Sequence, residues 1–162
     1  MNRPSKQDPN NVVIASNRKA RHDYAVLDEV EAGIVLRGSE VKSLRLGQVR
    51  INEAYARENR GEMWLEGMHI SPYSHATGFG SHVPDSARKL LLNRAEIARL
   101  SARMKQEHLT LVPLSLYFKE GRVKVLLALA KGRTRGDKRQ TLAKESARRD
   151  IEVALGRQRK GR

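Results

Sequence analysis

The chain contains no cysteine and few aromatic residues. Its 162 residues include one Trp, two Phe and four Tyr. Without cysteine there can be no disulfide, no thiolate nucleophile and no zinc ribbon, and such a chain suits a reducing compartment. With so few rings, the chain lacks the paired stacking surfaces that a non-specific single-strand binder uses. The residue types that are missing therefore exclude several functional classes.

Long apolar runs are missing as well. A membrane-spanning helix needs about 20 consecutive apolar residues, and no stretch of the chain approaches that length. The polar start at residues 1–10 lacks the apolar segment of a secretory signal peptide. We therefore expect a soluble, intracellular protein.

Acidic residues are scarce near the C-terminus. The net charge of the chain is +14, and residues 131–162 alone hold 12 Lys and Arg against 4 Asp and Glu. A folded body that ends in a concentrated cationic arm is typical of proteins that bind a polyanion, most often RNA or DNA. The sequence predicts a disordered leader at 1–11, a folded RNA-binding domain at 12–130 and a basic tail at 131–162.

Strand signals dominate the predicted domain. A turn at 59–61 is of the bulged-hairpin kind, a second turn at 119–121 joins the last two strands, and Pro113 marks a bulge or an edge. The pattern predicts a mainly β fold with short α-helices: an OB-fold-like, six-stranded antiparallel β-barrel with flanking helices and a basic C-terminal tail. The predicted strands lie at 22–30, 32–37, 51–58, 62–70, 109–118 and 122–130.

Two helices are predicted between the strands. Ser39 is a suitable N-cap for a helix that Gly47 ends. Asn93, with Glu96 three residues later, is a capping-box signature for a helix that reaches about residue 108. Residues 71–86 show no periodicity, and a loop of that length in a compact domain is usually functional or mobile.

The basic tail contains a helical pattern of its own. Small or apolar residues recur four positions apart at Ala143, Ala147, Ile151 and Leu155, with basic residues between them. Such a thin stripe is marginal in water, so we expect the tail to be disordered alone and to become helical on a polyanionic partner. The alternative is an inert tail that only adds solubility.

The sequence contains no recognisable catalytic or metal-binding pattern. His69, His75 and His82 match no helical or zinc-finger spacing. No serine stands in a nucleophile elbow, no Walker-type phosphate loop is present, and the carboxylates are too scattered for an acid–base pair. We expect no cofactor, no metal and no enzymatic activity. Recognition of a folded RNA by its shape and backbone suits the composition better.

Several blocks of the sequence resemble one known family. The blocks are Arg21–Tyr24, Glu31–Arg45, Gly67–Tyr73, Arg88–Asn93, Gly132 and Asp137–Arg139. Together they are similar to the SsrA-binding protein (SmpB) family. The resemblance implies a bacterial, cytoplasmic adaptor that binds the tRNA-like domain of transfer-messenger RNA (tmRNA), and we expect it to act as a monomer. In the family, this pair enters the empty A site of a stalled 70S ribosome, and the tail passes the decoding centre into the vacant mRNA channel. Translation then resumes on tmRNA, which tags the unfinished peptide.

By motif position, the resemblance assigns tmRNA binding to four residues: Glu31, Leu91, Asn93 and Lys124. A carboxylate repels phosphate, so Glu31 would accept a hydrogen bond from a base or sugar, or orient a neighbouring cation. Leu91 is equally compatible with a core position and Asn93 with a helix cap, whereas Lys124 faces away from the apolar side of its strand. The basic cluster before the first predicted strand adds Arg18, Lys19, Arg21 and His22.

The tail carries the ribosome-binding residues that the resemblance implies. Many relatives have a ring side chain, typically His, just before Asp137, but this chain has Gly136. Stacking on a decoding base is lost at that position, and we expect Arg133 and Arg135 to take over part of the contact. The full predicted set is Lys131, Gly132, Arg133, Arg135, Asp137, Lys138 and Arg139.

Two other functions remain open from the residues alone. A ribosomal or ribosome-assembly protein would also be a small basic barrel with a basic extension, but it would stay on translating ribosomes through a high-salt wash. A nuclease would cleave labelled RNA in the presence of Mg²⁺. A rescue adaptor would instead bind one structured RNA tightly and with strong salt dependence.

Overall fold

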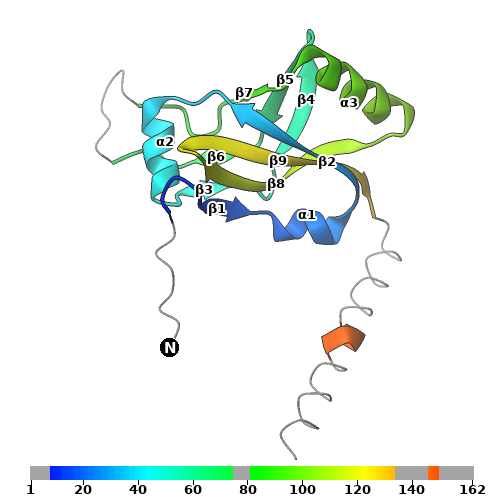
Figure 1. Cartoon of the computed structure of the whole chain (residues 1–162), viewed down its shortest axis with the longest axis horizontal. Helices are drawn as coiled ribbons and strands as arrows, with labels where there is room; N and C mark the ends of the chain where they lie inside the picture. Colours follow the sequence, from blue (N-terminus) through cyan, green and yellow to red (C-terminus); the bar gives the residue numbers. More distant parts are fainter. Residues whose placement is uncertain (1–7, 75–80, 134–145, 150–162) are drawn as a thin grey trace, which may run out of the picture.

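The structure is a computed structural model, and it describes residues 8–74, 81–133 and 146–149. Figure 1 shows α2 at one side of the barrel and α3 at the other. In chain order the elements are β1 (Val13–Ser16), α1 (Arg18–Asp23), β2 (Tyr24–Ile34), α2 (Gly38–Arg45), β3 (Val49–Arg50), β4 (Tyr55–Asn59), β5 (Glu62–Glu66), β6 (His69–Ile70), β7 (Arg88–Leu91), α3 (Arg94–Gln106), β8 (Thr110–Lys119) and β9 (Arg122–Gly132).

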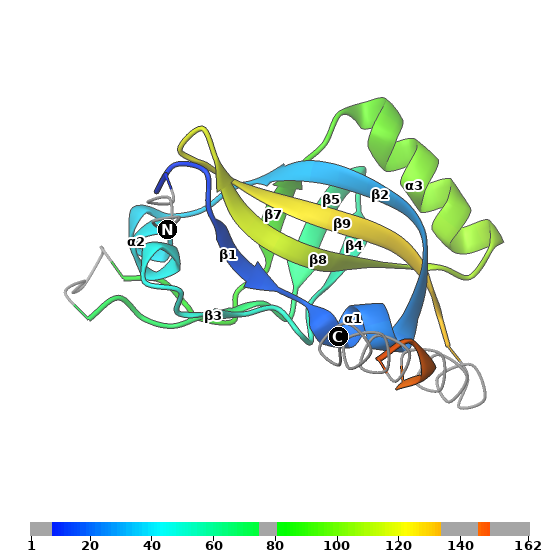
Figure 2. The same ribbon diagram turned by 60° about the horizontal axis from the view of Figure 1, so that its bottom comes forward.

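Six of the strands close into a ring. Hydrogen-bonded neighbours follow the order β8-β4-β5-β7-β2-β9, and β9 pairs back with β8. Every pairing in the ring is antiparallel. β1 pairs with β8 as an additional strand and leads directly into α1, as Figure 2 shows, while β3 and β6 form a separate ladder. The predicted OB-fold-like, six-stranded antiparallel barrel is confirmed.

The start of the barrel differs from the prediction. The segment 22–37 was expected to form two strands, but β2 is one strand that pairs with β9 from Tyr24 to Gly33. The residues just before it form α1, which begins where the side chain of Asn17 accepts a hydrogen bond from the Ala20 N–H at 3.0 Å. The basic cluster therefore lies on a helix, because an Asn cap and a buried Ala20 favour a turn of helix there.

The first hairpin is also shorter than predicted. β4 and β5 pair from Tyr55 to Glu66, and the flanking residues form the separate β3–β6 ladder. Gly67 interrupts the second arm: its φ is +77°, and a Cβ atom there would lie 2.6 Å from the Glu53 carbonyl oxygen. Only glycine fits that backbone position, so the chain must turn where an alternating pattern suggested a continuous strand.

Three short strands, β1, β3 and β7, lie outside every predicted strand. β7 follows the segment 81–86, which is described and contains neither strand nor helix. Its first residue, Arg88, is buried, with only 2% of its side chain exposed, and its guanidinium pairs with Glu40 of α2 at 2.6 Å. Arg88 also donates to the carbonyl oxygens of Met68 and Pro84 at 2.6 and 2.9 Å. This satisfied buried pair ties α2, β7 and the segments beside them together.

Apolar side chains fill the barrel. Val125, Leu127 and Leu129 share the inner face of β9, as their alternation predicted, and each is at most 1% exposed. Burying a side chain of this size contributes about 1.5–3 kcal/mol. On the outer face of the same region α1 covers a second, smaller cluster, formed by Ala20, Val112, Leu114, Ala128 and Ala130. Pro113 lies at a bulge in β8, as predicted.

One of the two predicted helix caps is confirmed. Asn93 Oδ1 accepts a hydrogen bond from the Glu96 N–H at 2.8 Å and caps α3. Ser39, however, is inside α2: the N-cap residue is Arg37, whose N–H donates to Glu40 Oε1 at 2.9 Å. The Ser39 hydroxyl instead forms a hydrogen bond with His82 Nδ1 at 2.9 Å. Ser39 was therefore a wrong choice of cap, because its side chain binds the segment that follows β6.

The two ends of the predicted domain extend beyond residues 12–130. Residues 8–11, assigned to the leader, form a turn, and the Asn10 carbonyl oxygen accepts from the Gly121 N–H at 3.1 Å. At the other end, Lys131 and Gly132 continue β9. Residues 1–7 and 134–145 lie outside the described residues, as do 150–162, so the leader and tail assignments stay predictions. The described tail residues 146–149 are helical.

A candidate nucleic-acid interface

Three of the predicted tmRNA-binding residues lie on one outer face of the barrel. Leu91 of β7 is the Cα partner of Gly33 in β2, and Gly33 is the partner of Lys124 in β9. Lys124 in turn lies opposite Tyr117 of β8. We call these four residues the Gly33 row. Side chains alternate along a strand, so Glu31 points outward two residues from Gly33, on the same face.

Gly33 leaves room for its neighbour in the row. A Cβ atom on Gly33 would lie 3.2 Å from the Leu91 Cβ and 3.4 Å from its Cδ1, so the Leu91 side chain lies over the glycine. Leu91 is 52% exposed, which makes the alternative assignment to the core wrong. The row thus presents an apolar side chain and Lys124 on the same outer face. Sequence reasoning missed Gly33 as a site residue, although a glycine inside a strand pattern often marks a close approach.

Two residues of β8 hold the Glu31 carboxylate. The Tyr117 hydroxyl donates a hydrogen bond to Glu31 Oε2, and Lys119 Nζ lies 3.2 Å from Oε1. The Tyr117 hydrogen bond, followed by Lys119 and the charge of Lys124, lowers the pKa of Glu31 against the opposing effect of burial. Burial and the neighbouring carboxylate raise the pKa of Tyr117, which keeps its hydroxyl proton. Glu31 is therefore ionised and fixed in position.

The contact with Lys119 fits one of the two roles considered for Glu31, that of orienting a neighbouring cation. Neither Tyr117 nor Lys119 was among the predicted site residues. Their outward direction follows from the alternation of β8, in which Leu116 and Phe118 belong to the core. That they meet Glu31 depends on strand register, which the chain sequence alone does not give.

Asn93 stands two residues after Leu91 and begins α3. Its Oδ1 is used by the cap on Glu96 N–H, so the structural role that competed with RNA binding is present. The amide nitrogen of the side chain is the group that this cap leaves for a ligand. Asn93 is exposed and continues the chain from the Gly33 row. A cap and a contact to RNA are thus compatible in one side chain.

The four predicted residues of α1 lie elsewhere. Tyr24, which follows α1, is seven residues from Glu31 along β2, and at about 3.3 Å per residue this is a separation of roughly 23 Å. Arg18 and Arg21 are exposed. The other two have partners: Lys19 pairs with Glu53 at 2.6 Å, and the Nδ1 of His22 lies 3.1 Å from Asp23 Oδ1. The structure therefore does not bring the α1 cluster to the Gly33 row.

The α1 cluster lies instead beside the start of the tail. Lys131 and Gly132 are exposed and pair with Ala25 and Tyr24 at the end of the β2–β9 ladder. The Arg133 N–H donates to the Asp23 carbonyl oxygen at 2.9 Å. We call this area, α1 together with Lys131, Gly132 and Arg133, the α1 end. Arg135, Gly136, Asp137, Lys138 and Arg139 lie outside the described residues.

Neither a metal-ligand cluster nor a membrane-spanning helix is found among the described residues. Among them, no three His, Cys, Asp or Glu side chains gather so that they could hold a metal ion. None of the described helices combines the length and the apolar character that crossing a bilayer requires. The described residues of the predicted site lie on two outer surfaces, at separate places on the barrel, and each surface carries Lys or Arg side chains.

Comparisons with known proteins give a consistent result. The model of the SmpB protein family matches residues 14–157. The SsrA-binding protein of Saccharopolyspora erythraea is 53% identical over 150 residues, which cover 93% of this chain and 94% of the relative. That of Mycolicibacterium smegmatis is 52% identical over 153 residues, covering 94% of each chain. A solved structure described as "tmRNA-SmpB: a journey to the center of the bacterial ribosome" shows 46% identity and a TM-score of 0.63, over 79% of this chain and 93% of that chain.

Proposed function

The chain belongs to the SmpB protein family, and on that premise we propose that it is the RNA-binding adaptor of trans-translation in a bacterial cytoplasm. As a monomer without enzymatic activity, it binds the tRNA-like domain of tmRNA and delivers it to the empty A site of a stalled 70S ribosome. The tail then tests whether the mRNA channel is empty. Tagging of the unfinished peptide and release of the ribosome follow.

The separation of the two surfaces is the observation that carries this proposal. The Gly33 row and the ionised Glu31 form a fixed face made of four neighbouring strands. The α1 end lies at the other end of β2, where the tail leaves the barrel. An adaptor between an RNA and a ribosome needs two such surfaces that can be occupied together. We assign tmRNA to the Gly33 row and the ribosome to the α1 end and tail.

The charges of the Gly33 row and of the neighbouring Glu31 and Lys119 suit a folded RNA. Lys119 and Lys124 provide ammonium groups for phosphate, and these contacts fix position without reading sequence. Glu31 repels phosphate but accepts hydrogen bonds from a base edge or a 2′-hydroxyl. The exposed Leu91 adds apolar contact. Together they favour a loop or elbow of a structured RNA over a regular duplex.

The proposal is tested by recovering the bound RNA. The tagged full-length protein is isolated from extract of its own cells, and the RNA that accompanies it is sequenced. We expect one dominant RNA with a tRNA-like end and an internal reading frame. Ribosomal RNA in stoichiometric amount, without that species, would instead show a ribosomal or ribosome-assembly protein.

A truncation separates the two surfaces. Lys131 and Gly132 complete the ladder with β2, so a chain that ends at Arg133 keeps the barrel whole, whereas one that ends at Ala130 removes paired strand residues. We expect the chain ending at Arg133 to bind tmRNA within about twofold of the full-length protein and to support no tagging on stalled ribosomes. Loss of tmRNA binding in this chain would contradict the division of roles. The chain ending at Ala130 shows the cost of damaging the ladder itself.

A further inference from the structure

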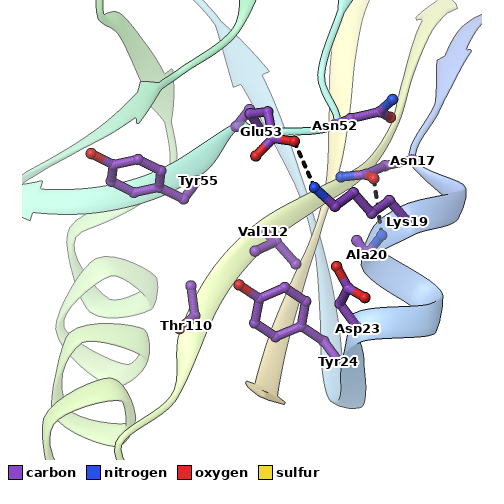
Figure 3. A pocket seen from close by; sticks show the side chains of 11 residues that line it. Asn17, Lys19, Ala20, Asp23, Tyr24, Asn52, Glu53, Tyr55, Thr110 and Val112 are labelled. Atoms are coloured by element: carbon purple, nitrogen blue, oxygen red, sulfur yellow. Dashed lines mark hydrogen bonds and ion pairs between the residues drawn. The ribbon is translucent and has the colours of Figure 1, made fainter. Parts of the chain in front are cut away.

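A pocket of about 270 Å³ opens beside α1, and the tmRNA-binding residues of the Gly33 row do not line it. It lies between α1, the segment that precedes β4, and the first residues of β8 (Figure 3). Its base is buried: Ala20, Ala54 and Val112 are each at most 4% exposed. Asn17, also buried, is fully engaged by the cap on α1 and by the carbonyl oxygens of Pro113 and Ile51. The base is therefore apolar and fixed.

Two tyrosine rings line the pocket. Tyr24 begins β2 and Tyr55 begins β4, and Figure 3 shows both rings among the lining side chains, on different sides of Val112. Tyr55 is 43% exposed, and its hydroxyl donates to Glu66 at 2.9 Å, which holds the ring in place. Tyr24 is half-buried and packs on the small cluster under α1. Two of the four tyrosines of the chain thus line one pocket.

The mouth of the pocket is polar. Lys19 reaches across to Glu53, and their charged atoms lie 2.6 Å apart (Figure 3). Asn52 and Asp23 complete the lining on this side. An amide offers one hydrogen-bond acceptor and two donors, and a carboxylate offers acceptors. These are the groups that match the edge of a nucleobase, which carries donors and acceptors side by side.

The volume of the pocket and the charges around it indicate which ligand would fit. Pockets for drug-sized ligands have about 300–1,000 Å³, so this one suits a single flat ring system. Exposed cations lie on the same end of the barrel: Arg18 and Arg21 on α1, and Lys131 at the end of β9. Side chains of this kind bind the phosphates on either side of a base that is drawn out of its stack.

From these observations we infer that the pocket between Tyr24 and Tyr55 takes one unstacked nucleobase of an RNA, with the α1 end holding the flanking phosphates. The inference rests on the proposed function for the nature of the partner. The base comes from an unpaired nucleotide of either tmRNA or ribosomal RNA, both of which offer the same chemistry. A side chain of the protein's own tail is the competing occupant.

The test is ultraviolet crosslinking followed by mass spectrometry of the digested protein. Full-length protein is irradiated in two complexes, one with tmRNA alone and one with tmRNA on stalled 70S ribosomes. We expect a nucleotide adduct on the peptide that contains Tyr55 or Tyr24. An adduct in both complexes identifies tmRNA as the source, and an adduct only on ribosomes identifies ribosomal RNA.

Three variants make the assignment specific. Tyr55→Ala removes one ring, and the crosslink at the pocket should fall about tenfold, as loss of a stacking ring predicts. Tyr55→Phe keeps the ring and should keep the crosslink within about twofold. Tyr73→Ala removes a ring that packs beside Lys42 of α2 instead, and it should change nothing at the pocket. Circular dichroism of each variant checks that the barrel is intact.

Two results would overturn the inference. One is the absence of any adduct on Tyr24 or Tyr55 in both complexes while tmRNA binding and its sensitivity to Glu31→Ala persist. The other is a chemical crosslink that places tail residues in the pocket within the ribosomal complex. Failure of the proposed function is distinguishable from both, because then tmRNA would not be bound at all.

Discussion

The two surfaces of this barrel are built in different ways. The Gly33 row depends on strand register: residues from β7, β2, β9 and β8 become neighbours only because three antiparallel pairings align them. The α1 end depends on one short helix, which covers the smaller apolar cluster, and on the last residues of β9. The first surface is part of the ring of strands, and the second is attached to its outside.

This difference has a functional meaning. A face set by the ladders of a closed barrel cannot shift without breaking hydrogen bonds, which suits a permanent RNA partner. The α1 end adjoins the tail and is held from outside the ring, by the packing of Ala20 on the smaller cluster and by the hydrogen bond from Asn17 to the Pro113 carbonyl. Its exposed side chains, such as Arg18 and Arg21, can change direction without breaking a strand ladder when the ribosome is met.

The strongest test changes each surface in turn and compares the two losses. The combined change Asp137→Ala, Lys138→Ala and Arg139→Ala should abolish tagging in a reconstituted reaction yet leave tmRNA affinity within about twofold, because the Gly33 row is untouched. Glu31→Ala should weaken tmRNA binding by about tenfold, since a fixed charged acceptor is lost. Filter binding at fixed salt gives the affinities. If the two variants fail in the same assay and to the same extent, the division between surfaces is wrong.

A second change should damage both surfaces together. Arg88→Met leaves the Glu40 carboxylate buried without its cation, and only 5% of that side chain is exposed. Removing one partner of a buried pair costs about 3–5 kcal/mol of unfolding free energy. Urea denaturation followed by circular dichroism measures it.

The control for this change adds Glu40→Gln to Arg88→Met, which removes the stranded charge and should recover part of the loss. A single variant Arg88→Met within about 1 kcal/mol of the wild type would show that water reaches Glu40. Binding at the Gly33 row and at the α1 end should decline in parallel, because the pair stabilises the whole barrel.

Gly33→Val tests the contrast between the two surfaces more finely, because it changes the shape of the Gly33 row without changing its charge. A Cβ at this position already lies 3.2 Å from the Leu91 Cβ, so a branched side chain must displace Leu91 from the row. We expect tmRNA affinity to fall about fivefold to tenfold, with no change in its salt dependence, since no phosphate contact is removed. Gly38→Ala is the matched control, because no atom lies within 4 Å of a Cβ there. Equal affinities for the two variants would exclude a role for the Leu91 position.

Sequence patterns predicted the barrel, but they did not predict which residues make up its two surfaces. The β8–β9 hairpin could be predicted because Val123, Val125, Leu127 and Leu129 recur at every second position of β9 and residues 119–121 have the composition of a turn. β7 could not be predicted, because its first residue, Arg88, is buried. An arginine is expected on the surface unless a buried partner such as Glu40 is known. Resemblance to a family supplied Glu31 and Leu91. It did not supply Tyr117, which reaches Glu31 across 86 residues of sequence.

The smallest effect concerns the ionisation of Glu31. Its folded-state pKa lies below the ordinary 4.5, chiefly because Tyr117 donates to the carboxylate. A group with a lowered folded pKa stabilises the fold above its unfolded pKa, and this contribution disappears as the pH falls through the folded value. The contact is partly exposed, so its energetic contribution is small. Glu31 should therefore remain ionised at mildly acidic pH, and tmRNA binding should persist there.

Tyr117→Phe removes the hydroxyl that donates and keeps the ring. The pKa of Glu31 should rise toward its ordinary value but stay below it, because Lys119 still lies 3.2 Å from Oε1 and favours the charged carboxylate. NMR titration of the Glu31 side-chain carboxyl carbon measures this directly, and Tyr73→Phe, a tyrosine beside α2, should leave it unchanged. An unaltered titration in Tyr117→Phe would mean that Lys119 alone holds the carboxylate. The face of the barrel would then be less rigid than its register suggests, and the contrast with the α1 end correspondingly weaker.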